Sequence, residues 1–337
     1  EIVFSGYSLN NKLFVINLDG SDVNGFPLDL GEKAKAGPAL ADFNGNGLDD
    51  IVLGTDNDHL YLIYDDGSIA PGFPFTGNDK FQAAPSIADI NGLKIIFSGN
   101  NDNYLYAINS DGSLRFSILT NGQVKTSPAF VDITGSIYVL FGSKDKNIYV
   151  VDINGNALSG WPITMDGDIN GGIVLSDFDG NGVPEIVAVT DAGTISVFHS
   201  DGNLFHHFPI DNELPFTGPP LIIDLDSDND LEIITGSINK LTVFDVKEWS
   251  LAGDYWDMYR NNNKRTGYFI YSAETECAVS LGDVNGDLIV NILDLVQISN
   301  YILGISTPMY ECAADYNQDG LVNILDLVQT VNYILEN

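Results

Sequence analysis

Two acidic segments near the C-terminus carry oxygen side chains at the spacing of a cation-binding loop. Positions 1, 3, 5, 9 and 12 of the first segment are Asp283, Asn285, Asp287, Asn291 and Asp294. The same positions of the second are Asp315, Asn317, Asp319, Asn323 and Asp326. A loop of this pattern wraps calcium and adds a backbone carbonyl at position 7, here Ile289 and Leu321. The sequence therefore predicts two calcium sites.

Three loops earlier in the chain share this chemistry, with oxygens at positions 1, 3, 5 and 9 and a backbone carbonyl at position 7. They are Asp42, Asn44, Asn46, Leu48 and Asp50; Asp177, Asp179, Asn181, Val183 and Glu185; and Asp224, Asp226, Asp228, Asp230 and Glu232. Ligands that are all oxygen favour calcium over zinc or copper. The alternative is a plain turn, held by side chain to backbone hydrogen bonds. The acid at position 9 favours calcium, whereas the loops after Asp89 and Asp132 lose the later oxygens and are expected to be metal-free.

The elements that must position these loops are short strands, which recur about every 45 residues through residues 1–271. One strand is predicted at 38–42, 85–89, 128–132, 172–177 and 220–224, and another at 13–17, 60–64, 104–108, 148–152, 195–198 and 241–244. Asp-Gly or Asn-Gly turns usually follow the second set, as in tight hairpins. The period predicts a six-bladed β-propeller, with seven blades as the alternative. Residues 255–268 are expected to supply the missing strand of the first blade.

The C-terminal residues 277–337 are predicted to form a small all-α module after a short linker at 272–276. Each acidic loop runs into nearly the same helical sequence, at 291–303 and 323–335. Most apolar helix positions are expected to form the core. Loop positions 10 and 11 are candidate partner-binding residues, namely Ile292, Leu293, Ile324 and Leu325. Cys277 and Cys312 precede the two loops, which allows either one disulfide in an oxidising compartment or two unpaired core residues.

Overall charge limits the classes of partner. The 337 residues hold 14 Lys and Arg against 47 Asp and Glu, a net charge of −33. Nucleic acid is therefore excluded, since phosphate binding needs the opposite sign. No apolar run reaches the roughly 20 residues of a membrane span. No signal peptide is present and Glu1 begins a strand-like run, so we expect a mature or processed form of a longer precursor.

Both regions resemble known families. Residues 1–271 resemble the FG-GAP propeller repeats of integrin-type and bacterial extracellular proteins, and residues 277–337 resemble a type I dockerin. The second resemblance implies two calcium ions in the module and docking onto a cohesin domain of a scaffold protein, through either of two equivalent faces. Ile-Leu at positions 10 and 11, often Ser-Thr in cellulosomal dockerins, indicates a more apolar docking surface. Leu288 replaces the usual glycine at position 6 and is expected to weaken the first site.

No catalytic motif stands out, because the four histidines form no His-Glu-x-x-His and neither a Gly-x-Ser-x-Gly nor a phosphate-binding loop is present. Arg260, Lys264 and Arg265 form the basic cluster and are expected to pair with carboxylates. The first hypothesis is a secreted, non-catalytic protein with two calcium ions in its dockerin and up to three in its propeller, which binds a carbohydrate or protein ligand. The alternatives are a dockerin-tethered carbohydrate-active lyase or hydrolase, and a self-assembling surface or fibre protein.

Overall fold

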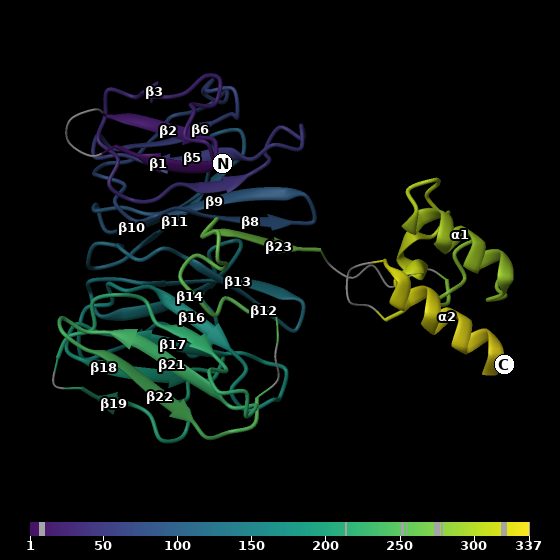
Figure 1. Cartoon of the computed structure of the whole chain (residues 1–337). Helices are drawn as coiled ribbons and strands as arrows, with labels where there is room; N and C mark the ends of the chain where they lie inside the picture. Colours follow the sequence, from purple (N-terminus) through teal and green to yellow (C-terminus); the bar gives the residue numbers. More distant parts are fainter. Residues whose placement is uncertain are drawn as a thin grey trace. The chain divides into compact units, whose positions relative to one another are not determined.

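The computed structural model forms two compact units, residues 1–272 and 273–337 (Figure 1). It describes residues 1–6, 11–212, 214–250, 253, 255–272, 277, 279–317 and 322–336. Within these residues the first unit is built from β-strands and the second from helices. Neither α-helix in the described part of the chain is long and apolar enough to cross a membrane.

Six sheets make up the first unit as described, and their successive strands pair antiparallel. Sheet one holds β1 (Ile2–Ser5), β2 (Lys12–Ile16) and β3 (Leu28–Asp29). Sheet two holds β4 (Ala39–Ala41), β5 (Asp50–Gly54), β6 (His59–Ile63) and β7 (Phe75–Thr76). Sheet three holds β8 (Ser86–Ile90), β9 (Leu93–Gly99), β10 (Tyr104–Asn109) and β11 (Leu114–Leu119).

The remaining sheets follow in chain order. Sheet four holds β12 (Ala129–Ile133), β13 (Ser136–Gly142), β14 (Asn147–Asp152) and β15 (Ile163–Thr164). Sheet five holds β16 (Ile173–Ser176), β17 (Glu185–Val189), β18 (Thr194–Phe198) and β19 (Ile210–Asp211). Sheet six holds β20 (Leu221–Ile223), β21 (Leu231–Gly236) and β22 (Leu241–Val246). A last strand, β23 (Tyr268–Tyr271), joins sheet three.

Burial explains why the strands read as continuous apolar runs. Every residue of β5, β17 and β18 is buried, because sheets on both sides cover the two faces of an inner sheet. β22, in contrast, alternates between exposed and covered residues, and β1 does the same. Sheets one and six lie at opposite ends of the unit (Figure 1). Each therefore has one face that no other sheet covers among the residues described.

Close backbone contacts between successive sheets require glycine at the repeated Gly-Phe/Trp-Pro corners. A Cβ on Gly25 would lie 2.1 Å from the carbonyl oxygen of Asp66, in the Asp-Gly turn of the next sheet. The same relation holds one repeat later, where a Cβ on Gly72 would lie 2.0 Å from the Asp111 carbonyl oxygen. No side chain fits in such a gap, so these repeats hold adjacent sheets together.

The segment after sheet six does not complete sheet one, and that sequence-based prediction is wrong. β23 pairs in parallel with β8, the first strand of sheet three. The residues before it accept hydrogen bonds from the first strands of other sheets: Leu175 N–H donates to the Trp256 carbonyl (2.9 Å) and Ile222 N–H to the Asp257 carbonyl (2.9 Å). Backbone N–H groups at a strand edge need hydrogen-bond acceptors when they are buried. The segment 255–271, called the tail below, supplies carbonyl acceptors to several sheets.

The second unit holds α1 (Ile292–Ile302), a short 3-10 helix η1 (Glu311–Ala314) and α2 (Ile324–Glu336). Asn291 caps α1, and its side chain accepts from the Leu293 N–H while Asp294 bonds back to the cap. The hydrophobic core has four fully buried residues among those described, Val284, Ile298, Ala313 and Ala314. A core this small contributes little free energy of folding by itself.

Candidate calcium-binding loops

The first aspartate of each described loop organises the backbone in the same way. Asp42 accepts from the N–H groups of Gly45 (2.7 Å, Oδ1) and Gly47 (2.8 Å, Oδ2). Asp283 accepts from those of Gly286 (2.8 Å, Oδ1) and Leu288 (2.9 Å, Oδ2). Asp224 in sheet six accepts from the equivalent residues Ser227 and Asn229, and Asp177 in sheet five accepts from Asn181 and Gly182 at positions 5 and 6. These bonds curl the backbone around the carboxylate, so the later oxygens face the same centre.

Positions 3 and 5 continue the curl. In the loop of sheet two, Asn44 Oδ1 accepts from the Asn46 N–H (3.0 Å) and Asn46 Oδ1 from the Leu48 N–H (2.8 Å). The loops of sheets five and six and the first dockerin-like loop repeat one or both bonds, through Asp179, Asn181, Asp228, Asn285 and Asp287. Three side chains of sheet six, Asp224, Asp226 and Asp228, lie with carboxylate oxygens within 4.8 Å of one another.

Position 6 requires a left-handed backbone in all four loops. The φ angles are 83° at Gly47 and Gly182, 70° at Asn229 and 69° at Leu288. Glycine adopts this conformation freely and asparagine tolerates it, whereas leucine is strained there. Leu288 therefore occupies a turn position that disfavours leucine, while its N–H still bonds to Asp283 as in the other loops. The expected weakening of the first calcium site stays a prediction.

The acid at position 9 closes each propeller loop from the start of the next strand. Asp50, Glu185 and Glu232 each accept from the N–H of position 2, at 2.8, 2.8 and 2.6 Å. All three are buried, with 0, 1 and 4% of their surface exposed. Burial raises the pKa of Asp50 and raises that of Glu185 to about 7. Buried carboxyl groups beside further acids favour a positively charged partner.

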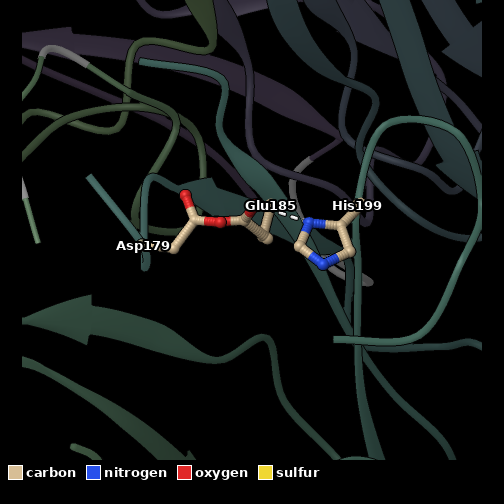
Figure 2. Close-up of side chains that lie close together, drawn as sticks. All are labelled: Asp179, Glu185 and His199. Atoms are coloured by element: carbon tan, nitrogen blue, oxygen red, sulfur yellow. Dashed lines mark hydrogen bonds and ion pairs between the residues drawn. The ribbon is translucent and has the colours of Figure 1, made fainter. Parts of the chain in front are cut away.

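Figure 2 shows a group beside the loop of sheet five that sequence reasoning missed. His199, directly after β18, places Nδ1 3.0 Å from Oε1 of Glu185. Together with Asp179, these residues bring ligand atoms within 4.8 Å of one another. The strand register identifies His199. Ile186 of β17 pairs with Phe198 of β18, so the residues one step further along the two antiparallel strands, Glu185 and His199, lie opposite each other.

In sheet six, a lysine instead of a histidine lies beside the loop. Lys247 Nζ lies 3.2 Å from Asp228, 3.1 Å from Asp230 and 2.7 Å from Asp245. Asp245 and the other two carboxylates raise the pKa of Lys247, which therefore stays charged. An ammonium ion here competes with a bound cation, so this loop is the least favourable of the three for calcium.

In the helical unit, the aspartate at position 12 joins the loop to its helix. Asp294 accepts from the N–H groups of Asn285 (3.2 Å) and Asn291 (2.9 Å), and Asp326 accepts from Asn317 (3.1 Å) and Asn323 (2.9 Å). Both aspartates are fully buried. Asp315 is among the described residues, whereas the predicted ligands Asp319 and Leu321 lie outside them.

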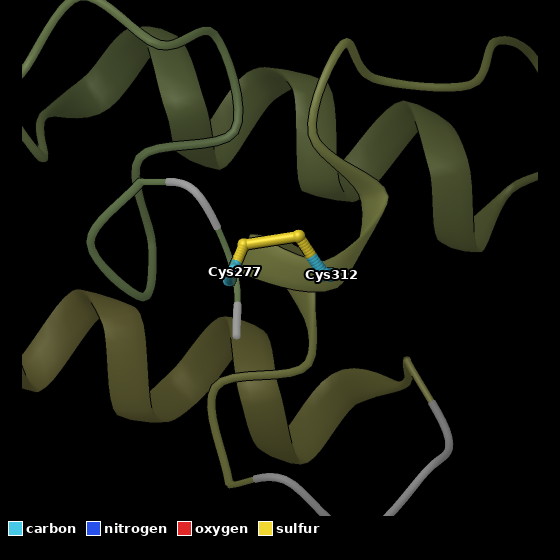
Figure 3. Close-up of a disulfide and its surroundings, with 2 residues drawn as sticks. All are labelled: Cys277 and Cys312. Atoms are coloured by element: carbon cyan, nitrogen blue, oxygen red, sulfur yellow. A yellow bond between two sulfur atoms is a disulfide. The ribbon is translucent and has the colours of Figure 1, made fainter. Parts of the chain in front are cut away.

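Cys277 and Cys312 form a disulfide with their Cα atoms 5.6 Å apart (Figure 3). Of the two alternatives that the sequence left open, the structure has the bridged one. The bond connects the start of the unit to η1, beside the core residues Ala313 and Ala314.

The four candidate partner-binding residues point to solvent. Exposed fractions are 65% for Ile292, 59% for Leu293, 60% for Ile324 and 57% for Leu325. Val296 and Val328 follow one turn later and are 52% and 49% exposed. Residues at i and i+4 share a helix face, so each helix starts with an exposed apolar patch. Fewer apolar helix residues are in the core than the sequence indicated.

The basic cluster behaves differently from the sequence-based expectation. Within the described residues, no carboxylate forms an ion pair with Arg260, Lys264 or Arg265. Arg260 is 3% exposed and donates to the carbonyl oxygens of Pro38 and Thr266, because the tail lies against the first strands of the sheets. The three side chains line a cavity of about 870 Å³ between sheet one, sheet two and the tail.

Donor chemistry in all these loops fits calcium. The side chains at positions 1, 3, 5 and 9 or 12 offer only carboxylate and amide oxygens, which are hard ligands. The backbone carbonyls at position 7, those of Leu48, Val183, Asp230 and Ile289, belong to loops that already curl around the first aspartate. Residues 281–335 match the family model of the dockerin type I domain.

This segment is a dockerin type I domain. Dockerins bind calcium, in agreement with the ligand set of both loops. A comparison with curated protein sequences finds no match to the chain.

Solved structures resemble the first unit in fold. BamB from Moraxella catarrhalis is 16% identical with a TM-score of 0.51, over 74% of this chain and 71% of BamB. BBS1N, crystallised in complex with ARL6DN and soaked with lead, is 12% identical with a TM-score of 0.51, over 72% of this chain and 73% of that one. Both are β-propeller proteins, so the unit attached to the dockerin is propeller-like.

Proposed function

We propose that this chain is a secreted, calcium-binding, non-catalytic protein whose propeller binds a ligand or partner while its dockerin docks onto a cohesin domain of a scaffold. The observation that carries the proposal is the pair of exposed Ile-Leu patches at equivalent positions of two helices. Large exposed apolar side chains on a small domain are typical of a protein interface. Calcium fixes both patches, because the loop ligands Asp294 and Asp326 belong to the same first helical turns.

The near-identity of the two helices supports two alternative docking faces. The test measures binding of the full chain to a panel of type I cohesin domains by calorimetry, in calcium and in chelator. Replacing Ile292 and Leu293 by aspartate removes one face, replacing Ile324 and Leu325 removes the other, and a third variant combines both. Leu335→Asp, at a still more exposed position near the end of α2, is the control. Each single-face variant should keep binding and the combined variant should lose it.

Two results contradict the docking proposal. One is binding that survives in the combined variant, and the other is the absence of calcium-dependent binding to any cohesin of the panel. Helical circular dichroism of each variant shows whether the domain remains folded.

We further infer two calcium ions in the dockerin and up to three in an FG-GAP-type propeller. Six sheets in the described residues support six blades over seven. The cavity of about 870 Å³ beside the tail has the volume of a small-molecule site and supports a ligand-binding role for the propeller. Calcium stoichiometry of the full chain, compared with variants that lack the first aspartate of each loop, tests the number of ions.

Self-association is a second candidate, favoured by the uncovered faces of the two end sheets. Ile2 and Phe4 of sheet one are 50% and 41% exposed, and Leu241 and Val243 of sheet six are 74% and 46% exposed. Faces that differ in this way would join copies head to tail into open chains. Sedimentation of the full chain and of Val243→Asp decides this, since a concentration-independent monomer excludes it. The carbohydrate-active enzyme stays a hypothesis, which turnover on a polysaccharide panel tests.

A further inference from the structure

The loop of sheet five differs from its two counterparts by a nitrogen ligand. The residue that lies across the strand pair from the acid at position 9 is Tyr64 in sheet two, His199 in sheet five and Asp245 in sheet six. Tyrosine and aspartate leave a loop with oxygen donors alone. Histidine adds an imidazole, which calcium sites do not use and which zinc, cobalt and nickel accept readily.

Surrounding contacts fix this nitrogen in place. Oε2 of Glu185 accepts from the Phe178 N–H at 2.8 Å, so Oε1 is the oxygen that faces His199 (Figure 2). Glu185 is 1% exposed and cannot turn to solvent. The imidazole packs against Phe205, a buried residue, with ring centroids 5.2 Å apart. The loop backbone at Phe178 therefore holds the Glu185 carboxylate, and Phe205, outside the loop, holds the imidazole.

We propose that residues 177–185 together with His199 bind a first-row transition-metal dication, with zinc as the type case, through Asp179, Glu185 and His199. The proposal rests on the inferred cation site of this loop and changes its preferred ion. Two ligands on one zinc ion, with bonds of about 2.1 Å at 90–110°, lie roughly 3.0–3.4 Å apart. Glu185 Oε1 and His199 Nδ1 share a hydrogen bond at 3.0 Å, the short end of that range.

Trp249 provides a signal for this loop, recorded in an Asp224→Ala background because the next residue, Ser250, donates to the Asn229 carbonyl of the loop in sheet six (2.9 Å). Its ring lies against the loop backbone, since a Cβ on Gly180 would be 2.7 Å from two ring carbons. All three tryptophans, Trp161, Trp249 and Trp256, precede the dockerin. Terbium, a calcium substitute, should therefore emit when Trp249 is excited, and Trp249→Phe should remove that emission. Zinc and calcium are then compared as competitors for the bound terbium.

In the wild-type chain, micromolar zinc should displace terbium in the presence of millimolar calcium. His199→Gln should abolish displacement by zinc and leave displacement by calcium unchanged. His206→Gln with His207→Gln is the control, because these neighbouring surface histidines are the obvious alternative zinc ligands and this variant should behave as wild type. Cobalt absorption provides a direct readout, with a nitrogen-dependent band that is lost only in His199→Gln.

The outcomes separate the two proposals. If zinc displaces terbium equally in wild type and His199→Gln, the transition-metal site is refuted while the calcium loop stands. If calcium displaces terbium from the wild-type chain but zinc does not, the transition-metal site is likewise refuted while the calcium loop stands. If terbium never reports binding in a folded chain, the cation site of this loop is refuted, and the zinc proposal with it.

Discussion

The loop at residues 177–185 and the loop at residues 283–294 share their local hydrogen bonds and differ in what supports them. In both, the first aspartate accepts from the N–H of position 6, Gly182 or Leu288. Strands follow the first loop, and its final acid opens β17 inside a core of many fully buried residues. A helix follows the second, beside four fully buried core residues. We therefore expect the loop to contribute a small share of the stability of the first region and a large share of the stability of the second.

Calcium removal should produce the largest difference in stability between the dockerin and the propeller. We expect a chelator to unfold the dockerin and leave the propeller folded, since the dockerin core is too small to compensate. Binding contributes about 2.7 kcal/mol per site when calcium is 100-fold above Kd. Scanning calorimetry in calcium and in chelator should show two transitions, of which only one moves far. Equal shifts of both transitions would contradict the comparison.

The disulfide should have the next largest effect, and only on the dockerin. Cys312→Ser opens a bridge between residues 35 apart in sequence, which the loop-entropy relation values at roughly 3–4 kcal/mol. The dockerin transition should fall while the propeller transition stays in place. Cys277→Ser is the control and should give the same shift, with no further loss in the double variant.

Leu288→Gly should stabilise the dockerin. The left-handed φ of 69° costs a leucine about 1–2 kcal/mol, and its side chain is 85% exposed, so little packing is lost. Calcium affinity of the first loop should rise together with the dockerin melting temperature. Gly182→Leu is the matched opposite change, because φ is 83° there and no atom lies within 4 Å of a built Cβ. An unchanged dockerin in Leu288→Gly would show that the turn is relaxed in solution.

Lys247→Met should convert the loop of sheet six into a better cation site. Removing the ammonium from between Asp228, Asp230 and Asp245 leaves three carboxylates without their counter-ion. A severalfold gain in calcium affinity at this loop is expected by calorimetry, and Lys94→Met, at a lysine of sheet three paired with Asp89, should give none. A loss of affinity in Lys247→Met would mean that the lysine organises the loop.

Acid should weaken the attachment of the tail strand by the smallest amount. Burial by itself raises the pKa of Asp89, but hydrogen bonds from Lys94 and Tyr268 outweigh it and hold the pKa below its usual value. Because the pKa of Asp89 is lower in the folded state than in the unfolded state, the carboxylate stabilises the fold at any pH above its unfolded pKa of about 3.9. This stabilisation is lost as the pH falls through the folded-state pKa. Urea midpoints of the propeller should therefore drop below about pH 4, and Asp89→Asn should show a flatter decline. An identical pH profile in the variant would contradict this.

The sequence by itself determined the features that depend on neighbours in the chain. Loop spacing, the unfavourable turn position of Leu288 and the β period all depend on residues close together in the chain, so a pattern in the sequence is enough to find them. The dockerin was identifiable for the same reason, since each loop and its helix form one continuous motif.

Tertiary structure decided everything that joins distant segments. It paired β23 with β8 instead of sheet one, and placed His199 beside Glu185 and Lys247 over Asp228. It left Val296 and Val328 exposed, although their spacing resembles that of core residues. These outcomes depend on strand register and on which edges and faces remain free once the sheets have packed. Spacing along the chain carries no information about them.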